Sequence, residues 1–547
     1  MAFLPISRTD LQSRGWDCLD IILISGDAYV DHPSFAAALI ARSLEAAGYR
    51  VGIISQPDWR NEQEFLVLGV PKLFFGVSAG NMDSLVNHYT AQRRLRHDDA
   101  YSPDGKAGLR PDRASLIYTN VLKRLFKGVP VVLGGVETSL RRIAHYDYWQ
   151  DKIRNSILSD SKADILIYGM GEKPVLELSQ RLSNGETIKN IQNLPSSVVF
   201  SSSEPGPDSI ILPEAESCTD KRTFLHLTRM FNEHHDSEIL YQKTANRWLK
   251  HNPPCAELSS DEMDALYELP FENKPHPMYN GKVIPAFEQI KASITSHRGC
   301  YGGCSFCSIA CHQGRKVQSR SERSILKEAG KLKGTISDIG GPTANMYASR
   351  CKLDYPKSCK RQSCLFPAIC PNLIFQHQKQ LSMLDKVSHL PQIKHVYIAS
   401  GIRHDMALHD DIYIRALATR YTGGRLKLAP EHSVPSVLRL MGKPDIGLYE
   451  EFCSKFHRFT AEAGIQRQVI PYLIIGHPGT TLEDALHLRN WLRKNRIKVE
   501  QVQEFTPTPM SISTCMYYTG LDYYTGESIH IPSPGEVRRQ KELILGS

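Results

Sequence analysis

The chain has 547 residues and a formal net charge of +8, with 41% hydrophobic and 23% charged residues. This length predicts several domains, and the composition is that of a globular protein able to bury real cores. No apolar run approaches the roughly 20 residues of a membrane span, and residues 1–20 lack the apolar core of a signal peptide. We therefore expect a cytoplasmic protein without a membrane partner. The modest charge leaves a nucleic-acid partner open without arguing for one.

Residues 1–193 alternate short apolar runs with helix-like segments such as 32–50 and 114–127. The apolar runs lie at 18–26, 51–55, 72–78, 129–134 and 164–168. This alternation predicts a Rossmann-like α/β domain, in which a parallel sheet carries helices on its faces. Ligands of such sheets bind beyond the carboxyl ends of the strands. Glycine-rich turns follow three of the runs, at 26–27, 134–138 and 169–172.

Residues 194–281 form a proline-punctuated and turn-rich connecting region, which we expect to pack on the domain that follows. From 282 to 515, strand-like and helix-like segments alternate again. One strand precedes a cysteine loop, and the others are predicted at 335–339, 394–399, 425–429, 468–475 and 499–505. Six β/α units predict a partial TIM-like (β/α)6 barrel with its site residues at the strand C-termini. Thr481 is expected to cap the helix after the fifth strand.

The cysteine loop holds Cys300, Cys304 and Cys307 at C-x3-C-x2-C spacing, with Phe306 just before the third cysteine. Thiolates are soft ligands suited to iron-sulfur clusters or zinc. A [4Fe-4S] cluster usually takes four cysteines, so three on one loop would leave one iron open. Cys311 follows and offers an alternative, in which four cysteines close a zinc or electron-transfer site without an open iron.

This three-cysteine loop resembles the signature of the radical SAM superfamily. The resemblance implies that Cys300, Cys304 and Cys307 hold a [4Fe-4S] cluster and that the fourth iron is chelated by S-adenosyl-L-methionine. It also implies an iron-sulfur enzyme that takes an electron from a donor such as flavodoxin or ferredoxin. In that family the electron cleaves S-adenosyl-L-methionine to methionine and a 5'-deoxyadenosyl radical.

The same resemblance implies cofactor contacts at the strand ends. Gly340 and Gly341 take the place of a G-G-E-like segment that contacts the methionine amino group, although a proline replaces the glutamate. Ser400 and Arg403 lie where the family has polar contacts to ribose or carboxylate, and Arg403 could bind a carboxylate through two donors. Glu431 ends the fourth strand, where it could orient the adenosyl group. A tight turn at the glycines and a surface position for the arginine are the alternatives.

A second group of cysteines lies in an insertion at 344–371, and residues 516–547 form a C-terminal extension. The group has C-x7-C-x4-C-x5-C spacing and consists of Cys351, Cys359, Cys364 and Cys370. Four soft ligands so close in sequence predict a second metal or iron-sulfur site. Scattered buried cysteines are the alternative.

The turns at 134–135 and 169–172 resemble those of the cobalamin-binding-type Rossmann domain that precedes many radical SAM barrels. The usual lower-ligand motif of that fold is D-x-H-x-x-G, which the segment at 27–33 does not reproduce. His32 directly follows Asp31 and precedes Pro33, so we expect it to start a helix. The sequence therefore argues against cobalamin binding, although some cobalamin enzymes of the superfamily lack this histidine.

Four longer segments resemble one uncharacterised radical SAM subfamily, the YgiQ-type proteins. They are DIGGPTANMY at 338–347, RQSCLFPAICPNL at 361–373, LKLAPEHS at 426–433 and QEFTPTPMS at 503–511. That subfamily supplies no established substrate. The leading interpretation is thus a radical SAM enzyme that abstracts hydrogen from an unidentified substrate. A cobalamin-dependent radical SAM methyltransferase and a non-catalytic, cysteine-rich zinc-binding protein are the alternatives.

Overall fold

The computed structural model describes residues 3–355 and 359–546, and the chain forms two compact units. The first unit consists of Met1–Ala256, Ala265–Lys291 and Thr508–Met510. The second unit consists of Glu257–Asp264, Ala292–Pro507 and Ser511–Ser547. Most of the predicted connecting region therefore belongs to the first unit.

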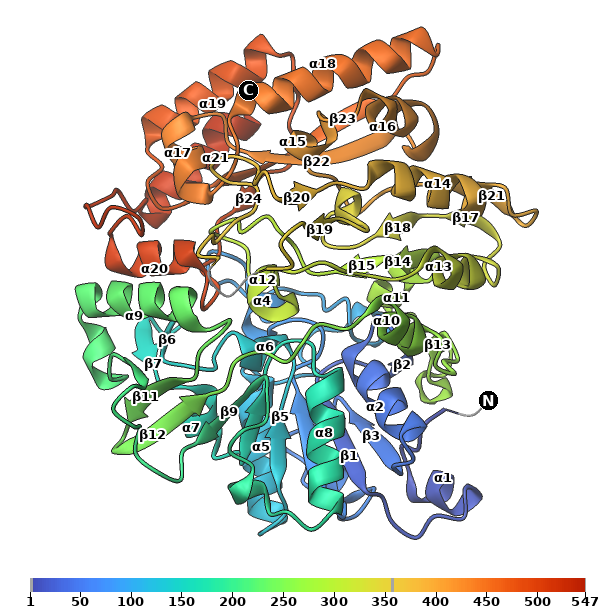
Figure 1. Cartoon of the computed structure of the whole chain (residues 1–547), viewed down its shortest axis with the longest axis vertical. Helices are drawn as coiled ribbons and strands as arrows, with labels where there is room; N and C mark the ends of the chain where they lie inside the picture. Colours follow the sequence, from blue (N-terminus) through green and yellow to red (C-terminus); the bar gives the residue numbers. More distant parts are fainter. Residues whose placement is uncertain (1–2, 356–358, 547) are drawn as a thin grey trace. The chain divides into compact units, whose positions relative to one another are not determined.

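The first unit is built on one nine-stranded sheet (Figure 1). Its strands are β1 (Ile21–Ser25), β3 (Val51–Ser55), β4 (Phe74–Ser78), β5 (Val131–Leu133), β8 (Ile165–Ile167), β9 (Ser197–Phe200), β10 (Ile210–Leu212), β11 (Leu240–Thr244) and β12 (Arg247–His251). Five parallel strands lie in the order β3-β1-β4-β5-β8. If these five strands are numbered 1 to 5 in chain order, their order across the sheet is 2-1-3-4-5, which is a doubly wound arrangement. The predicted Rossmann-like sheet is therefore present.

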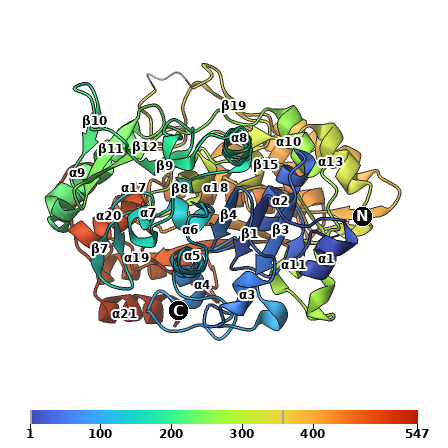
Figure 2. The same ribbon diagram turned by 90° about the horizontal axis from the view of Figure 1, so that it is seen from below.

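Helices cover both faces of this sheet because its apolar residues alternate between two cores. The helices are α2 (Ala36–Ala46), α5 (Ala114–Leu125), α8 (Glu172–Ser183) and α9 (Lys221–His234). On β1, Ile21 packs in the core that holds the α2 and α8 residues, and Ile22 packs in the core that holds the α5 residues. Figure 2 shows α5 and α8 on opposite faces of the strands. Burial on both faces explains why these strands appear in the sequence as continuous apolar runs.

The second unit repeats strand and helix, and its strands pair in parallel in chain order. They are β14 (Ser293–Thr295), β17 (Gly334–Ile336), β18 (Asp338–Gly340), β21 (Ile393–Val396), β22 (Arg425–Glu431), β23 (Gln468–Ile475) and β24 (Gln503–Glu504). Parallel pairing joins β14 to β18, β17 to β21, β22 to β23 and β23 to β24. A parallel bridge between Ile402 and Leu428 links the segment after β21 to β22. Only one residue separates β17 from β18, so these two strands continue one another and occupy one position. The parallel strands named above therefore occupy six positions.

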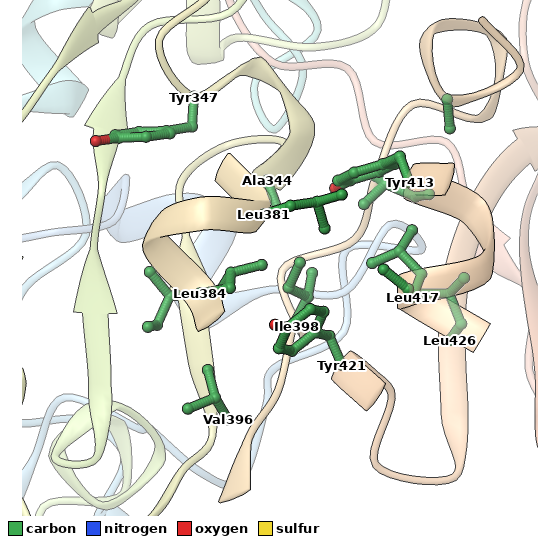
Figure 3. Packing of buried hydrophobic residues seen from close by; sticks show 14 of the residues in the cluster. Ala344, Tyr347, Leu381, Leu384, Val396, Ile398, Tyr413, Leu417, Tyr421 and Leu426 are labelled. Carbon is green, nitrogen blue, oxygen red and sulfur yellow. The ribbon is translucent and has the colours of Figure 1, made fainter. Parts of the chain in front are cut away.

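The second unit has helices on both faces of these strands. They include α13 (Glu322–Ala329), α14 (His377–Ser388), α16 (Asp411–Ala416), α17 (Pro435–Met441), α18 (Ile446–Glu462), α19 (Leu482–Lys494), α20 (Ile512–Thr519) and α21 (Pro534–Leu545). On β23, Leu473 and Ile475 pack with residues of α19 and α21, whereas Ile474 packs with residues of α17. On β22, Leu426 and Leu428 are buried in the helix-covered core, whereas Lys427 between them is exposed. Figure 3 shows Leu426 of this core near Leu417, together with Val396 of β21 and Ile398, which lies two residues beyond that strand. Among the described residues, no helix has both the length and the apolar character needed to cross a membrane.

His377 makes this core sensitive to acid. Its ring is 4% exposed and stacks on Tyr413 with 4.4 Å between ring centroids, and its Nε2 is buried without a hydrogen-bond partner. Burial lowers the pKa of His377 from 6.5 to about 4. As the pH falls, His377 in the unfolded chain binds a proton before His377 in the folded chain does. The stability that the neutral, buried His377 contributes is therefore complete above pH 6.5 and is lost as the pH falls from 6.5 toward 4.

Replacing His377 by phenylalanine should therefore reduce the acid sensitivity of unfolding. Between pH 8 and pH 5, wild type should lose about 2 kcal/mol more stability than H377F. Urea unfolding at the two pH values measures this difference. The exposed His487→Asn variant serves as the control and should lose as much stability as wild type. Equal acid sensitivity of H377F and wild type would show that His377 is not a buried neutral group.

Candidate functional site

The three cysteines lie on a loop whose ends are held by short strand pairs. β14 leads into the loop, and β15 (His297–Arg298) pairs antiparallel with β16 (Gln318–Ser319). Across the loop, the Cys300 amide donates a hydrogen bond to the Gly314 carbonyl at 3.2 Å. The thiols therefore follow the first strand of the second unit, at the end where β/α units place their site residues.

Gly302 brings two of the sulfurs together. Its amide donates to Cys300 Sγ at 3.4 Å. A Cβ at position 302 would lie 3.3 Å from Cys300 Sγ and 3.6 Å from Cys304 Sγ, so a side chain there would crowd the Cys300 sulfur. The Cys307 amide donates to the Cys304 carbonyl at 3.1 Å, which brings the third cysteine back toward the other two.

The donor set of this loop fits an iron-sulfur cluster. Desolvation raises the pKa of Cys300 and of Cys307, and the neighbouring Cys304 raises both further. Neighbouring thiols in a desolvated loop lose their protons together only when cations share the space, as iron would. Within residues 3–355 and 359–546, no three His, Cys, Asp or Glu side chains gather around a point as ligands of one metal ion do. Cysteines that hold a cluster bind different irons and therefore stand farther apart.

Arg403 links a carboxylate to the cysteine loop. Its Nε and Nη2 donate to the two oxygens of Asp405 at 2.9 and 2.5 Å, and its Nη1 lies 3.6 Å from Cys304 Sγ. Burial alone would lower the pKa of Arg403 and raise that of Asp405, but each partner's charge reverses the shift of the other. The two donors that the sequence assigned to a cofactor carboxylate are thus bound to Asp405. The third donor points to the sulfur.

Glu431 and Lys443 form a second buried pair near the thiols. Lys443 Nζ lies 3.9 Å from Glu431 Oε1, which is too long for a hydrogen bond. Burial raises the pKa of Glu431, while Lys443 and Arg403 oppose this. The charge of Lys443 also reaches Cys300. Glu431 has a φ of +70°, a strained conformation that costs about 1–3 kcal/mol and is found most often at functional sites.

A polar chain anchors the part of the loop around Phe306. Ser305 Oγ donates to the Leu440 carbonyl at 2.6 Å and lies 2.9 Å from Ser513 Oγ. Ser513 Oγ in turn lies 2.6 Å from His477 Nε2, and the Phe306 ring packs edge-on against His477 with 6.4 Å between centroids. Burial lowers the pKa of His477, so this histidine is neutral near pH 7. The aromatic residue of the motif is therefore packed beside an uncharged imidazole.

Gly340, the last residue of β18, and Gly341 lie in a crowded turn. Ser296 donates to the Gly340 carbonyl from its amide at 2.7 Å and from its hydroxyl at 3.1 Å. A side chain on Gly340 would overlap Ser400 Oγ, and a Cβ on Gly341 would lie 2.6 Å from a backbone carbonyl of β15. Ser400 donates to Asp338 Oδ1 from its amide at 3.1 Å and from its hydroxyl at 3.2 Å. Gly340 and Ser400 are thus brought together, and both already have partners within the chain.

The carboxyl edge of the first unit holds a buried charged group and a small pocket. Asp27 follows β1 and lies 3.0 Å from Arg110, which also donates to Asp99 at 2.9 Å. Burial raises the pKa of Asp27 to about 6. A small pocket lies beside Asp27, between the ends of β1 and β3 and the start of α2. His32 Nδ1 accepts a hydrogen bond from the Ser34 amide at 3.1 Å in the turn before α2. The helix begins at Ala36 with Phe35 as its N-cap, so His32 does not start it as the sequence predicted.

Sequence reasoning missed Asp405, Lys443 and Ser513. Asp405 stands two residues after Arg403, and this short Arg-x-Asp spacing could have indicated an ion pair. Lys443 and Ser513 reach the cysteine loop from distant parts of the chain. Nothing in the residues next to them in sequence signals that contact.

Comparison with known proteins identifies the family. Residues 3–293 match the family model described as Radical SAM N-terminal, and residues 500–542 match a Domain of unknown function (DUF3362). The UPF0313 protein GSU2873 of Geobacter sulfurreducens is 46% identical over 100% of this chain and 92% of its own length. The UPF0313 protein YgiQ of Escherichia coli (strain K12) is 43% identical over 99% of this chain and 83% of its own length.

Solved structures share the fold at low identity. The radical S-adenosylmethionine methyltransferase TsrM from Kitasatospora setae, with cobalamin and a [4Fe-4S] cluster bound, has a TM-score of 0.50 and 15% identity, covering 96% of this chain and 84% of TsrM. The cobalamin-dependent S-adenosylmethionine radical enzyme OxsB, with aqua-cobalamin bound, has a TM-score of 0.50 and 11% identity, covering 92% of this chain and 55% of OxsB. At identities of 15% and 11%, the structural similarity shows a shared fold and nothing more specific.

These structures correct the expectation against cobalamin. TsrM and OxsB share the fold of this chain and hold cobalamin, so the missing D-x-H-x-x-G motif is no ground for setting the cofactor aside. The expectation rested on the absence of a single histidine. Open α/β sheets, however, hold their ligands in the crevice beyond the strand ends, which does not depend on that histidine.

Three observations point to the same family. They are the cysteine loop, the family model that matches more than half of the chain, and the relatives that match it over nearly its whole length. The chain belongs to the UPF0313, or YgiQ-type, family of the radical SAM superfamily.

Proposed function

We propose that this protein is a radical SAM enzyme in which Cys300, Cys304 and Cys307 hold a [4Fe-4S] cluster with one open iron for S-adenosyl-L-methionine. The observation that carries the proposal is the three-cysteine loop after the first strand, with Arg403 Nη1 3.6 Å from Cys304 Sγ. When bound and reduced, such a cluster supplies the electron that cleaves the sulfonium to methionine and a 5'-deoxyadenosyl radical. The radical then acts on a substrate still to be identified.

The residues of the chain position and shield this chemistry. Arg403 and Lys443 place two cations beside the thiolates, and the N–H directed at Cys304 Sγ is the kind of contact that tunes a cluster's reduction potential. The carboxylate of Glu431, only loosely held by Lys443, can accept hydrogen bonds from an ammonium or a ribose hydroxyl. In this proposal the six strands curve into a partial (β/α)6 barrel, and Gly340, Gly341 and Ser400 line its carboxyl end beside the cofactor.

Product analysis tests the proposal. Protein reconstituted anaerobically with iron and sulfide is reduced in the presence of S-adenosyl-L-methionine, with dithionite or with flavodoxin or ferredoxin as donor. We expect 5'-deoxyadenosine and methionine in equal amounts, formed faster when cell extract supplies the substrate. A colourless protein that holds zinc instead of iron would contradict the proposal and favour a non-catalytic metal-binding protein.

A cobalamin-dependent radical methyltransferase is the second candidate. The first unit has the doubly wound 2-1-3-4-5 sheet, with a pocket at its carboxyl edge beside Asp27 and the start of α2. TsrM, which shares the fold, is a methyltransferase with cobalamin bound. In this candidate the first unit binds the corrinoid without the usual lower histidine ligand.

Binding of hydroxocobalamin tests this candidate. Stoichiometric retention of corrinoid absorbance after gel filtration is expected, together with S-adenosylhomocysteine and a methylated product. Ala37→Trp, which fills the pocket, should weaken retention, whereas Ala47→Trp at the C-terminal cap of α2 should not. A protein that retains no corrinoid yet forms 5'-deoxyadenosine would reject the candidate and support the first proposal.

A further inference from the structure

Two short strands of the second unit bound the cysteine-rich insertion (Figure 1). They are β19 (Arg350–Cys351) and β20 (Leu373–Ile374), which pair antiparallel with Cys351 opposite Leu373. The Leu373 amide donates to the Cys370 carbonyl at 2.9 Å, and the Cys370 amide donates to the Cys364 carbonyl at 2.7 Å. These contacts bring Cys351, Cys364 and Cys370 into one region although they are spread along the insertion.

Arg361 organises the rest of the loop. Its guanidinium donates to the Ser363 carbonyl at 3.1 Å and to the Ala368 carbonyl at 2.6 Å. Cys359 stands two residues before Arg361. The strand pairing and the backbone hydrogen bonds thus gather Cys351, Cys364 and Cys370, and Cys359 directly precedes the segment that Arg361 holds.

Cys364 and Cys370 pack against buried apolar side chains. Leu365 and Tyr301 belong to the apolar cluster against which both cysteines pack. All thirteen cysteines of the chain are free thiols, so no disulfide accounts for the grouping. A bound metal centre would account for it and turn the thiols into ligands.

We propose that Cys351, Cys359, Cys364 and Cys370 are the four ligands of a second iron-sulfur cluster. All four donors are thiols, and four cysteine thiolates are the usual ligand set of an iron-sulfur cluster. Four cysteines complete the ligand set, so this cluster has no open iron for S-adenosyl-L-methionine.

The insertion is tied directly to the first cysteine loop. The Cys364 amide donates to the Tyr301 carbonyl at 3.1 Å, and Ser363 Oγ donates to the Gly302 carbonyl at 2.6 Å. A Cβ on Gly303 would lie 2.8 Å from Ser363 Cβ, so the two loops are in close contact. The second cluster therefore lies beside the loop that holds the first, and its loss should loosen that loop.

The test uses a chain from which the first cluster site is removed. The triple variant C300A/C304A/C307A, reconstituted anaerobically, should retain about two or four irons per chain with matching acid-labile sulfide. Its reduced EPR signal should not change when S-adenosyl-L-methionine is added. Adding Cys364→Ser should remove this iron, whereas adding Cys453→Ser, a half-buried cysteine of α18 outside both groups, should not. The readout does not involve turnover, so failure of the proposed function would not affect it.

The converse variant keeps the test decisive if the triple variant does not fold. Cys364→Ser in the wild-type chain should lower iron to about four per chain while a SAM-responsive signal remains. A folded triple variant without iron, or one that holds zinc instead, would overturn the proposal. So would an iron content of the wild-type chain that Cys364→Ser leaves unchanged.

Discussion

Replacing Cys304 by alanine is expected to abolish the cluster signal and to reduce 5'-deoxyadenosine formation to background. Cys304 lies between the other two ligands, and its charge affects the pKa values of both Cys300 and Cys307. Loss of a ligand should exceed the roughly 10–100-fold effect of losing an outer-shell partner. Iron content, the EPR spectrum of the reduced protein and product chromatography measure the result.

Cys311→Ala is the matched control for this experiment. Cys311 lies on α12 (Ile309–Gln313), and its charge reaches Cys307. In the open-iron account it is not a ligand, so the variant should keep the cluster and the cleavage reaction. If Cys311→Ala destroys the cluster as completely as Cys304→Ala, the loop holds a closed four-cysteine site and the open-iron account is wrong.

Replacing Arg403 by methionine is expected to destabilise the protein by about 3–5 kcal/mol, because it leaves the Asp405 carboxylate buried and unpaired. Without its partner, the pKa of Asp405 should rise above that of the unfolded chain. The loss of stability should therefore be largest near pH 7 and smaller at acidic pH, where Asp405 is protonated. Urea unfolding as a function of pH measures the effect. The EPR spectrum of the reduced variant reports the loss of the contact to Cys304.

Two further variants separate the ion pair from the size of the side chain. Arg403→Lys keeps the charge but loses the two-donor contact, so it should fall between wild type and Arg403→Met. The double variant R403M/D405L should recover part of the lost stability, because no buried charge is left without a partner. A double variant less stable than Arg403→Met alone would show that the pair does not dominate the stability of this region.

Local patterns in the sequence predicted much of the fold. The parallel strands of the first unit are buried on both faces, so the apolar runs at 51–55 and 129–134 were recognisable as β3 and β5. At the start of α19, Thr481 Oγ1 accepts from the Asp484 amide at 3.1 Å, and Asp484 accepts from the Thr481 amide at 2.8 Å. Both features depend on residues close together in the chain, which a single sequence reveals.

The sequence missed the four strands β9 to β12, which form one end of the first sheet. On β11, Leu240, Gln242 and Thr244 are buried while Tyr241 and Lys243 are less buried, so the buried face is partly polar. This sequence does not show the alternation of apolar and polar residues that normally marks a half-buried strand. The sheet therefore extends into a region where the sequence predicted only a connecting segment.

The cysteine motif was recognisable in the sequence, but its electrostatic surroundings were not. Cys300, Cys304 and Cys307 lie within one loop, whereas Asp405 and Lys443 reach that loop only through the fold. The sequence suggested that Arg403 binds a cofactor carboxylate, and the structure pairs it with Asp405 instead. Partners that are distant in sequence leave no local pattern, so their identification required coordinates.

The most direct test of the central claim is the EPR spectrum of the reduced wild-type protein with and without S-adenosyl-L-methionine. If Cys300, Cys304 and Cys307 leave one iron open, the cofactor binds that iron and changes the g-values of the reduced cluster. The change should survive Cys364→Ser, which removes only the second site. A spectrum that saturating S-adenosyl-L-methionine leaves unaltered would contradict the open-iron account.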